Sequence, residues 1–480
     1  MNKLKKFMCV ALAGMCVASF VACNGNGSSN NENSGNGGGT SYVDTGVAIT
    51  APVGTERTVT VCLNTGINPT DVGYADVALR SALSKLKTTT TLSNGLFQYK
   101  YTKMLHNDAI ESGIRLKFED YGWGEPLIQK LSAAFASGQG PDVITGETQM
   151  SAYMKQGYLE PFPDDLEQYV RENMHPLSYQ AMTDAEGNIY GVAPCASIPV
   201  LVWNKELLTS AGVSSDIVEN GVETWSEWLA VGQQLRGINS YMGGIYCGSN
   251  FGGYLRSTPF IYMAGGSLVN AQNKANFVST ENKTALEFLR EMSELNLLGI
   301  MASNTEDTFY NYFNGKRMGY LVEGSWRIQQ AQDLGIDVGF CALPTKNVGE
   351  KSKNVAIGAT YMSVPKYSNN KEAAFKAIKC YIDEAAQTIV AESDLRPCTY
   401  LPIADSTEYA TMSPVQSKVY AILKNETEIM ELPAFASGQE QFWEAWSSAL
   451  TSTVYWEYGS SAPDITGLLE TAQAKTNTLS

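Results

Sequence analysis

The stretch from Leu127 to Pro161, LIQKLSAAFASGQGPDVITGETQMSAYMKQGYLEP, decides the fold. Apolar residues recur at helical spacing from Leu127 to Phe135, and Gly138 can adopt the left-handed conformation that ends a helix. Val143–Ile144 is a short apolar run that indicates a buried strand, and small polar residues separate it from a second helix around 151–156. Because ligands bind just past the carboxyl ends of strands in an open α/β sheet, the stretch predicts a helix, a strand, a ligand loop and a helix.

The N-terminus carries the features of an export signal. Met1–Lys6 is basic, Phe7–Ala22 is apolar, and Cys23 follows directly. A basic start, a short apolar run and small residues before a cleavage point are typical of a signal peptide. The run is shorter than the roughly 18–20 apolar residues of a membrane-spanning helix. The sequence FVAC ending at Cys23 resembles a bacterial lipobox, with Phe in place of the usual Leu. It predicts a signal peptide over 1–22 and a lipid on Cys23; a plain secretory signal or a membrane anchor is the alternative.

A linker follows the predicted lipid anchor. Asn24–Ser41 consists almost entirely of Asn, Gly and Ser, so it cannot bury apolar surface and predicts a flexible tether. We assign 23–54 to the lipidated cysteine and this linker. Beyond the signal, the sequence has no apolar segment long enough to span a bilayer, so we expect a soluble body. The export signal and the lipobox predict that this body lies outside the cytoplasm, anchored to the bacterial membrane.

The charge of the chain excludes some partners. Lys and Arg number 34 against 49 Asp and Glu, a formal net charge of −15. Removal of the three lysines of the signal makes the balance more negative still. An acidic balance argues against binding to nucleic acid and to anionic lipid surfaces.

Six cysteines lie beyond the predicted signal and anchor, and no two of them stand at CxxC spacing, which argues against a zinc or redox motif. Their even number permits disulfides in an exported protein, but a body of this size does not need them. We favour buried thiols over disulfides for these residues: Cys62, Cys195, Cys247, Cys341, Cys380 and Cys398.

Several runs together resemble one protein family. They are AFASGQGPDV from Ala134, GNIYGVAPCASIPVLVWNK from Gly187, FYNYFNGKRMGYLVEGSW from Phe309 and IGATYMSVPKYSNNKEAAFKAIKCYIDE from Ile357. In this order they resemble the solute-binding proteins of ATP-binding-cassette importers, particularly the sugar-binding group that includes maltodextrin-binding protein. The resemblance extends from Arg57 to the C-terminus, and the ordered set is more specific than any single run.

The resemblance implies an α/β fold of two lobes, as in periplasmic binding proteins, with a ligand cleft between them. The chain would cross between lobes near Pro194, Val355 and Pro397. Lobe I would comprise 55–194 plus 355–397, and lobe II 195–354 plus 398–480. The implied function is capture of a mono- or oligosaccharide and its delivery to a membrane permease, by a monomer that needs no cofactor and no metal. Polyols, peptides and polyamines remain alternative ligands.

An enzyme is the first competing class. The chain has two histidines and lacks HExxH, GxSxG and GxxxxGK[ST] motifs, so a histidine triad or a three-histidine metal site is nearly excluded. Carboxylate pairs for glycoside hydrolysis stay open, since the two carboxylates need not be close in sequence. We expect no enzymatic activity. A glycan-active exported enzyme and a sensor or adhesin lipoprotein without a transporter are the alternatives.

Aromatic residues are the first candidates for sugar contact, because sugars present C–H groups on their faces and hydroxyls at their edges. Trp326 follows an expected strand, and by resemblance it and Trp443 fall on stacking positions of the family. Trp123 lies in a Gly-rich turn after the strand Ile114–Phe118, and Tyr254 lies beside two glycines. Each could instead pack in the core, as we expect for Trp225 and Trp228.

Polar candidates lie at strand ends and crossovers. Glu147 and Gln149 follow the strand Val143–Ile144, and Asn64 follows the strand Arg57–Leu63. Ser197 is supported by its position and by the resemblance, and could instead satisfy local backbone. The remaining two candidates lie beside predicted crossovers: Tyr361, placed after a strand over 357–360, and Arg396, which could instead form a hinge ion pair.

Two helix starts have the capping-box pattern, in which a polar cap residue is followed three positions later by Glu or Gln. They are Thr224 with Glu227, and Asn369 with Glu372.

Overall fold

The computed structural model describes residues 49–63, 73–79, 93–122, 124–147, 149–238, 244–248, 251–294, 306–455 and 461–476. They all belong to one unit, Asp44–Ser480. Three residues singled out above, Cys23, Asn64 and Trp123, lie outside the described residues.

The first lobe is built on a sheet whose strands come from distant parts of the chain. β1 (Arg57–Leu63) pairs in parallel with β3 (Ile114–Asp120), and β2 (Gly73–Tyr74) pairs antiparallel with β3. β10 (Tyr361–Pro365) lies between β4 (Ile144–Gly146) and β5 (Leu159–Glu160), antiparallel to both. A parallel bridge from Val61 to Val143 joins the two sets of strands.

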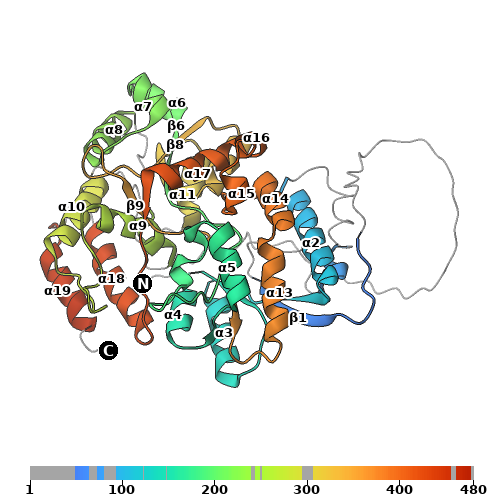
Figure 1. Cartoon of the computed structure of the whole chain (residues 1–480). Helices are drawn as coiled ribbons and strands as arrows, with labels where there is room; N and C mark the ends of the chain where they lie inside the picture. The colour runs from blue at the N-terminus through green and yellow to red at the C-terminus, as the bar shows by residue number, and fades with distance from the viewer. Residues whose placement is uncertain are drawn as a thin grey trace, which may run out of the picture. The chain divides into compact units, whose positions relative to one another are not determined.

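Helices from both halves of the chain cover this sheet. α2 (Ser93–Glu111) packs against α13 (Lys371–Ile382) and α14 (Glu384–Ser393), so blue and orange helices lie together in Figure 1. The other helices of this lobe are α3 (Glu125–Ser137), α4 (Gln149–Lys155) and α5 (Asp164–Asn173), followed by the short 3-10 turns η1 (Pro176–Ser178) and η2 (Gln180–Met182).

The quoted stretch folds as the sequence predicts. α3 has Pro126 in its first turn and ends at Gly138, whose φ of 65° is left-handed. The strand after it is β4, and α4 begins at Gln149, two residues earlier than expected. The loop between this strand and helix carries Glu147.

The second lobe has a smaller antiparallel sheet in which β6 (Val200–Asn204) lies between β7 (Tyr320–Glu323) and β8 (Val338–Cys341). Its core contains Trp203, Trp225 and Trp228, and the indole of Trp225 stacks on Phe288 with ring centroids 4.2 Å apart. Packing of Trp225 and Trp228 is thus confirmed. In sequence, the helices between β6 and β8 are α6 (Lys205–Ser210), α7 (Ser215–Asn220), α8 (Trp225–Gly237), α9 (Phe251–Met263), α10 (Thr280–Glu294), α11 (Glu306–Asn314) and α12 (Trp326–Asp333). The C-terminal helices are α18 (Gln439–Val454), which packs against α10, and α19 (Ile465–Thr476).

The segments expected to cross between the lobes lie side by side. Cys195 forms an antiparallel bridge with Cys398, and Ser197 forms one with Ile357. Next to them, β9 (Ser352–Asn354) pairs in parallel with β11 (Thr427–Ile429). Between the third crossover and β11 the chain forms α15 (Leu401–Ala404), α16 (Tyr409–Met412) and α17 (Pro414–Glu426).

Two local predictions are wrong. The strand expected over 357–360 is β10, which begins at Tyr361, because residues 361–365 find partners in β4 and β5. Asn369 does not cap a helix: α13 starts after Asn370, whose side-chain amide donates to the carbonyl of Thr58 and to Asp142 instead. The other capping box, Thr224 with Glu227, is confirmed in both of its hydrogen bonds.

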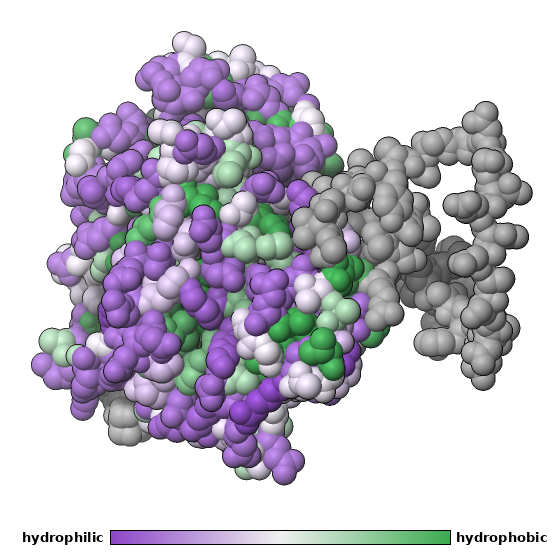
Figure 2. Space-filling model, turned by 45° about the vertical axis from the view of Figure 1, so that its right-hand side comes forward, coloured by the Kyte–Doolittle hydropathy of each residue, from purple (hydrophilic) through white to green (hydrophobic). Residues whose placement is uncertain are grey.

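The face of the molecule seen in Figure 2 is mainly polar. Figure 2 shows a face on which hydrophilic residues predominate and hydrophobic residues gather in small groups. None of the helices in the described ranges has the length and apolar character needed to cross a bilayer. The six body cysteines are thiols, and all but Cys341 are buried, as expected.

Candidate functional site

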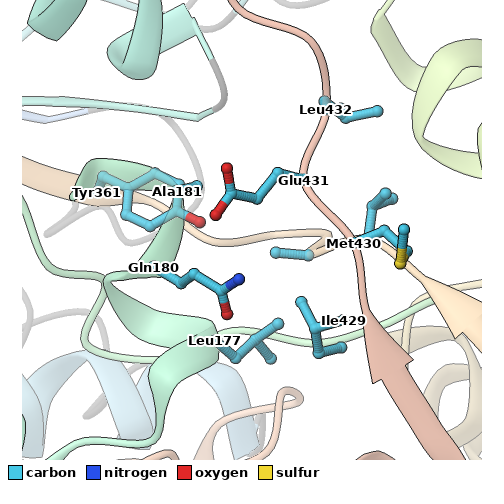
Figure 3. A pocket seen from close by; sticks show the side chains of 10 residues that line it. Leu177, Gln180, Ala181, Tyr361, Ile429, Met430, Glu431 and Leu432 are labelled. Carbon is cyan, nitrogen blue, oxygen red and sulfur yellow. The ribbon is translucent and has the colours of Figure 1, made fainter. Parts of the chain in front are cut away.

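A small cavity lies where the end of β4, the start of β10 and the segment after β11 meet. Tyr361, the first residue of β10, pairs with Gly146, the last residue of β4, so the loop that carries Glu147 begins beside Tyr361. From the other side, residues 429–432 run past the same space (Figure 3). The cavity encloses about 30 Å³ and is lined by Leu177, Gln180, Ala181, Val355, Ala356, Tyr361, Ile429, Met430, Glu431 and Leu432.

The phenol of Tyr361 is the most unusual group in this lining. Its side chain is 1% exposed, and the hydroxyl has no hydrogen-bond partner among the described residues. Burial raises the pKa of this phenol, and the carboxylates of Glu147 and Glu431 raise it further, so the group stays protonated at neutral pH. A buried polar group without a partner costs free energy, which a ligand hydroxyl placed in the cavity would recover.

The segment that bears Glu431 is fixed at several points. The hydroxyl of Tyr262 donates to the carbonyl of Glu431 at 2.7 Å, and the amide of Met430 donates to the carbonyl of Asn354 at 2.7 Å. Farther along, Lys155 of α4 donates to the carbonyl of Ala434 at 2.9 Å. This last bond joins the first lobe to the segment that enters α18.

Trp326 lies next to this segment. It is half-buried and packs on the same apolar cluster as Met430 and Leu432, a cluster formed by Leu255, Tyr262, Val355 and Ile357. Its indole covers two glycines: a Cβ atom would lie 2.2 Å from the ring if placed on Gly324 and 2.8 Å from it if placed on Gly358. Glycine at both positions therefore allows the ring to approach the backbone closely.

A buried ion pair holds the turn from which Trp326 projects. Arg256 of α9 donates from Nε and Nη2 to the carboxylate of Glu323, at 2.6–3.0 Å, and both side chains are at most 4% exposed. Tyr310 donates to the same carboxylate at 2.6 Å, and the backbone amide of Gly324 donates to it at 2.8 Å. The carboxylate of Glu323 thereby fixes the backbone between β7 and α12.

Two of the predicted polar ligands hold the crossovers together. Ser197 is fully buried, and its hydroxyl hydrogen-bonds the hydroxyl of Ser325 at 3.0 Å. Arg396 pairs with Asp394 through two 2.9 Å bonds and donates to the carbonyl of Gly358 at 2.9 Å. Burial lowers the pKa of Arg396, but the Asp394 carboxylate and other nearby groups together outweigh it, and the net shift is upward. These contacts agree with the alternative roles given above: Ser197 satisfies hydrogen bonds of neighbouring groups, and Arg396 forms an ion pair at the hinge.

Tyr254 and Trp443 meet each other. Their rings stack with centroids 4.5 Å apart and planes 13° apart, and both side chains are less than 10% exposed. Burial raises the pKa of Tyr254 to about 12. Each ring therefore presents one face to the other and not to solvent.

The structure thus brings part of the predicted set together. Glu147 and Tyr361 lie at the cavity or directly beside it; Trp326, Ser197 and Arg396 lie around the neighbouring crossovers. The side chain of Gln149 lies against Gly146, where an added Cβ atom would be 3.0 Å from its amide nitrogen. No metal-binding group of three or more His, Cys, Asp or Glu side chains occurs within the described ranges.

Sequence reasoning missed Glu431, Gln180 and the Arg256–Glu323 pair. Glu431 follows a three-residue strand in a stretch without a recognisable motif, so nothing local marked it. Arg256 is the one charged residue of the run YLRSTPF, and Glu323 directly follows the apolar run YLV. A lone charge in or directly after such a run indicates a buried partner, and this signal could have found the pair.

Comparison with known proteins assigns the family. The sequence model described as bacterial extracellular solute-binding protein matches residues 97–388, more than half of the chain. The chain is 22% identical over 288 residues to a binding protein of Brucella abortus (strain 2308), covering 56% of this chain and 65% of that relative. It is 22% identical over 263 residues to the maltotriose-binding protein of Pyrococcus abyssi, covering 53% of each. The chain thus spans less than two thirds of the length of these curated relatives.

A solved structure gives the fold. The solute-binding protein of an ABC transporter from Thermotoga lettingae, bound with α-D-tagatose, matches with a TM-score of 0.66 at 19% identity, over 88% of this chain and 99% of that chain. Likeness at this identity confirms the α/β fold of two lobes. With the family pattern covering the greater part of the sequence, this chain belongs to the family of bacterial extracellular solute-binding proteins.

Proposed function

We propose that this chain captures a mono- or oligosaccharide between its lobes and delivers it to the permease of an ATP-binding-cassette importer. The observation that carries the proposal is the buried hydroxyl of Tyr361, which faces the cavity without a partner among the described residues. A sugar hydroxyl both donates and accepts hydrogen bonds, so it satisfies a phenol and a neighbouring carboxylate at once. The apolar cluster at Trp326 supplies a surface against which the C–H face of a sugar ring can pack.

Ligand entry requires the lobes to separate. A cavity of about 30 Å³ holds roughly one water molecule, whereas small-molecule sites measure roughly 300–1,000 Å³. The segment 429–432 must therefore move away from Tyr361 before a sugar can enter. In this proposal lobe I comprises 55–194 plus 355–397, lobe II comprises 195–354 plus 398–480, and the crossovers are the hinges.

The descriptions of two similar proteins name sugars as their ligands, which supports the sugar assignment. The Pyrococcus abyssi relative is a maltotriose-binding protein, and the Thermotoga lettingae structure holds tagatose. These are binding proteins, which supports a role without catalysis for this chain. No cofactor enters the proposal.

The remaining parts of the proposal concern the N-terminus. A lipid on Cys23 would anchor a monomer to the outer side of the bacterial membrane, and the Asn/Gly/Ser linker would hold the lobes within reach of the permease. Labelling of cells with a radioactive fatty acid tests this part: the unaltered chain should take up the label and Cys23→Ala should not, and an unlabelled unaltered chain would contradict lipid anchoring.

The test of function is thermal melting of the full chain in detergent against a panel of sugars. A ligand that binds only the folded form adds about 2.7 kcal/mol at 100 times its dissociation constant. Tyr361→Phe removes one hydroxyl and should weaken binding of the sugar found by about 5- to 100-fold, because it removes a partner of the ligand. The matched control is Tyr381→Phe, which removes another buried phenol hydroxyl without a partner among the described residues, away from the cavity.

The outcomes separate the parts of the proposal. Binding lost in Tyr361→Phe and kept in Tyr381→Phe supports capture in this cavity. A shift with peptides or polyamines but with no sugar would leave the importer role and refute the sugar assignment. Steady cleavage of a bound glycan would identify an enzyme instead.

A further inference from the structure

The polar lining of the cavity contains an acidic side chain and no basic one among its described residues. Of the lining residues, only Gln180, Tyr361 and Glu431 carry polar side-chain atoms. Figure 3 shows the carboxylate of Glu431 directed toward the ring of Tyr361, with the amide of Gln180 nearby. A solute in this space therefore meets an amide, a neutral phenol and a carboxylate.

A second carboxylate lies on the opposite lobe. Glu147 follows Gly146, which pairs with Tyr361 across β4 and β10. Both Glu147 and Glu431 raise the pKa of Tyr361, after the larger effect of burial. The two carboxylates thus impose a negative potential on the same hydroxyl, Glu431 from the cavity lining and Glu147 from the loop after β4.

The nearby cations are held by other groups. Arg396 pairs with Asp394, and Arg256 pairs with Glu323. The guanidinium of Arg327 lies over the ring of Tyr310, 3.5 Å from its centroid. Lys155 donates to the carbonyl of Ala434. None of these side chains belongs to the cavity lining described above.

We propose that the cleft discriminates by charge: it accepts neutral and cationic carbohydrates, rejects uronates and sugar phosphates, and Glu431 is the residue that sets this selection. A carboxylate accepts hydrogen bonds from hydroxyl and ammonium groups, but it repels a second carboxylate or a phosphate brought beside it in a partly desolvated cleft. The inference rests on the proposed function, in which the sugar enters this cavity.

A test that needs no known ligand uses ionic quenching of Trp326. The half-buried indole packs on the same cluster as the two neighbours of Glu431, so it senses the local potential. Quenching of the full chain by caesium and by iodide is measured, and the signal of Trp326→Phe is subtracted. Caesium should quench Trp326 about twofold or more better than iodide at low ionic strength, and Glu431→Gln should reduce this ratio.

Glu428→Gln is the matched control, because Glu428 lies three residues earlier on the same segment, is exposed, and is absent from the cavity lining. It should leave the ratio unchanged. Equal quenching by both ions in the unaltered chain, or an equal effect of Glu428→Gln and Glu431→Gln, would overturn the inference.

A second test of the inference measures the shift in melting temperature of the chain with matched sugars that differ in charge. Glucose, glucosamine, glucuronate and glucose 6-phosphate serve as probes, with the neutral, amino and acidic forms of any better sugar found. The acidic forms should bind at least tenfold more weakly than their neutral parent sugar. Glu431→Gln should reduce this difference in affinity between the acidic and neutral forms. An acidic form that binds more tightly than its parent refutes the charge selection and leaves sugar capture intact. If no sugar binds while the quenching ratio holds, sugar capture fails and the selection among carbohydrates fails with it, and the quenching ratio then shows only that Glu431 makes the cleft negative.

Discussion

The indole of Trp443 on α18 stacks on the phenol ring of Tyr254 on α9, with their centroids 4.5 Å apart and their planes inclined by 13°. The two residues are far apart in sequence, and each was a candidate platform for a sugar. The stack joins helices α9 and α18.

Trp443→Ala should lower the free energy of unfolding by about 3–5 kcal/mol, because it removes a large buried side chain. In a double-mutant cycle with Tyr254→Ala, the two effects should differ from additivity by about 0.5–1.5 kcal/mol, the coupling of a stacked pair. Denaturant unfolding without sugar measures both quantities. Additivity within about 0.3–0.5 kcal/mol would show that the rings do not stabilise each other.

Gly358→Ala should destabilise the fold and disturb Trp326. Gly358 has a φ of +64°, and an added Cβ atom would lie 2.8 Å from the indole of Trp326. Gly113→Ala is the control, since its φ is +74° and no atom lies within 4 Å of an added Cβ. The control should cost about 1–2 kcal/mol for the left-handed backbone alone. Gly358→Ala should cost more and shift the tryptophan emission; equal costs and unchanged emission would contradict the close packing.

Arg256→Met should lower the free energy of unfolding by about 3–5 kcal/mol, because it leaves the Glu323 carboxylate buried without its cation. The control is Lys376→Met, which breaks the exposed pair of Lys376 with Glu372 and should cost about 0–1 kcal/mol. Urea unfolding of both variants measures the difference. A similar loss of unfolding free energy in the two variants would show that the buried pair contributes no more to stability than the exposed pair.

Asp108 on α2 should make stability depend on pH. Burial, followed by the carboxylates of Asp383 and Glu111, raises the pKa of Asp108 to about 7, whereas an unfolded chain has an aspartate pKa of about 3.9. Between these values the folded protein holds a proton that the unfolded chain has lost. The contribution of Asp108 to the free energy of unfolding is therefore fully present below about pH 4 and is lost as pH rises through 7.

Asp108→Asn should remove this pH-dependent contribution. The free energy of unfolding of the variant should therefore rise relative to that of the unaltered chain as the pH increases from 5 to 8. Asp405→Asn is a control of opposite sign: hydrogen bonds from Lys424 and Tyr420 outweigh burial and lower the pKa of Asp405. That variant should lose stability at neutral pH. Urea unfolding across this pH range measures both, and parallel pH profiles for the unaltered chain and Asp108→Asn would contradict the prediction.

Patterns within a short stretch of sequence correctly predicted helices and strands whose ends are set by residues of the same stretch. The strand Arg57–Leu63 has the bounds of β1, the left-handed Gly138 ends α3, and Thr224 caps α8. The family and the α/β fold of two lobes followed from the order of several such elements.

The details of the site depend on partners far away in sequence. The start of β10 at Tyr361 is set by β4 and β5, some two hundred residues earlier in the chain. The stack of Tyr254 with Trp443 and the bond between Ser197 and Ser325 join distant segments in the same way. Periodicity and strand-end position carry no information about such pairings, so they pointed to Glu147, in the loop after β4, and not to Glu431, in the cavity lining.

The place of β10 between β4 and β5 also governs when this protein can fold. The first lobe cannot complete its sheet, or receive α13 and α14, until the ribosome has passed residue 393. Such contacts between distant residues form slowly. Until β10 has been synthesised, β4 and β5 lack the strand that lies between them, so the first lobe reaches its final fold only after most of the chain has been made.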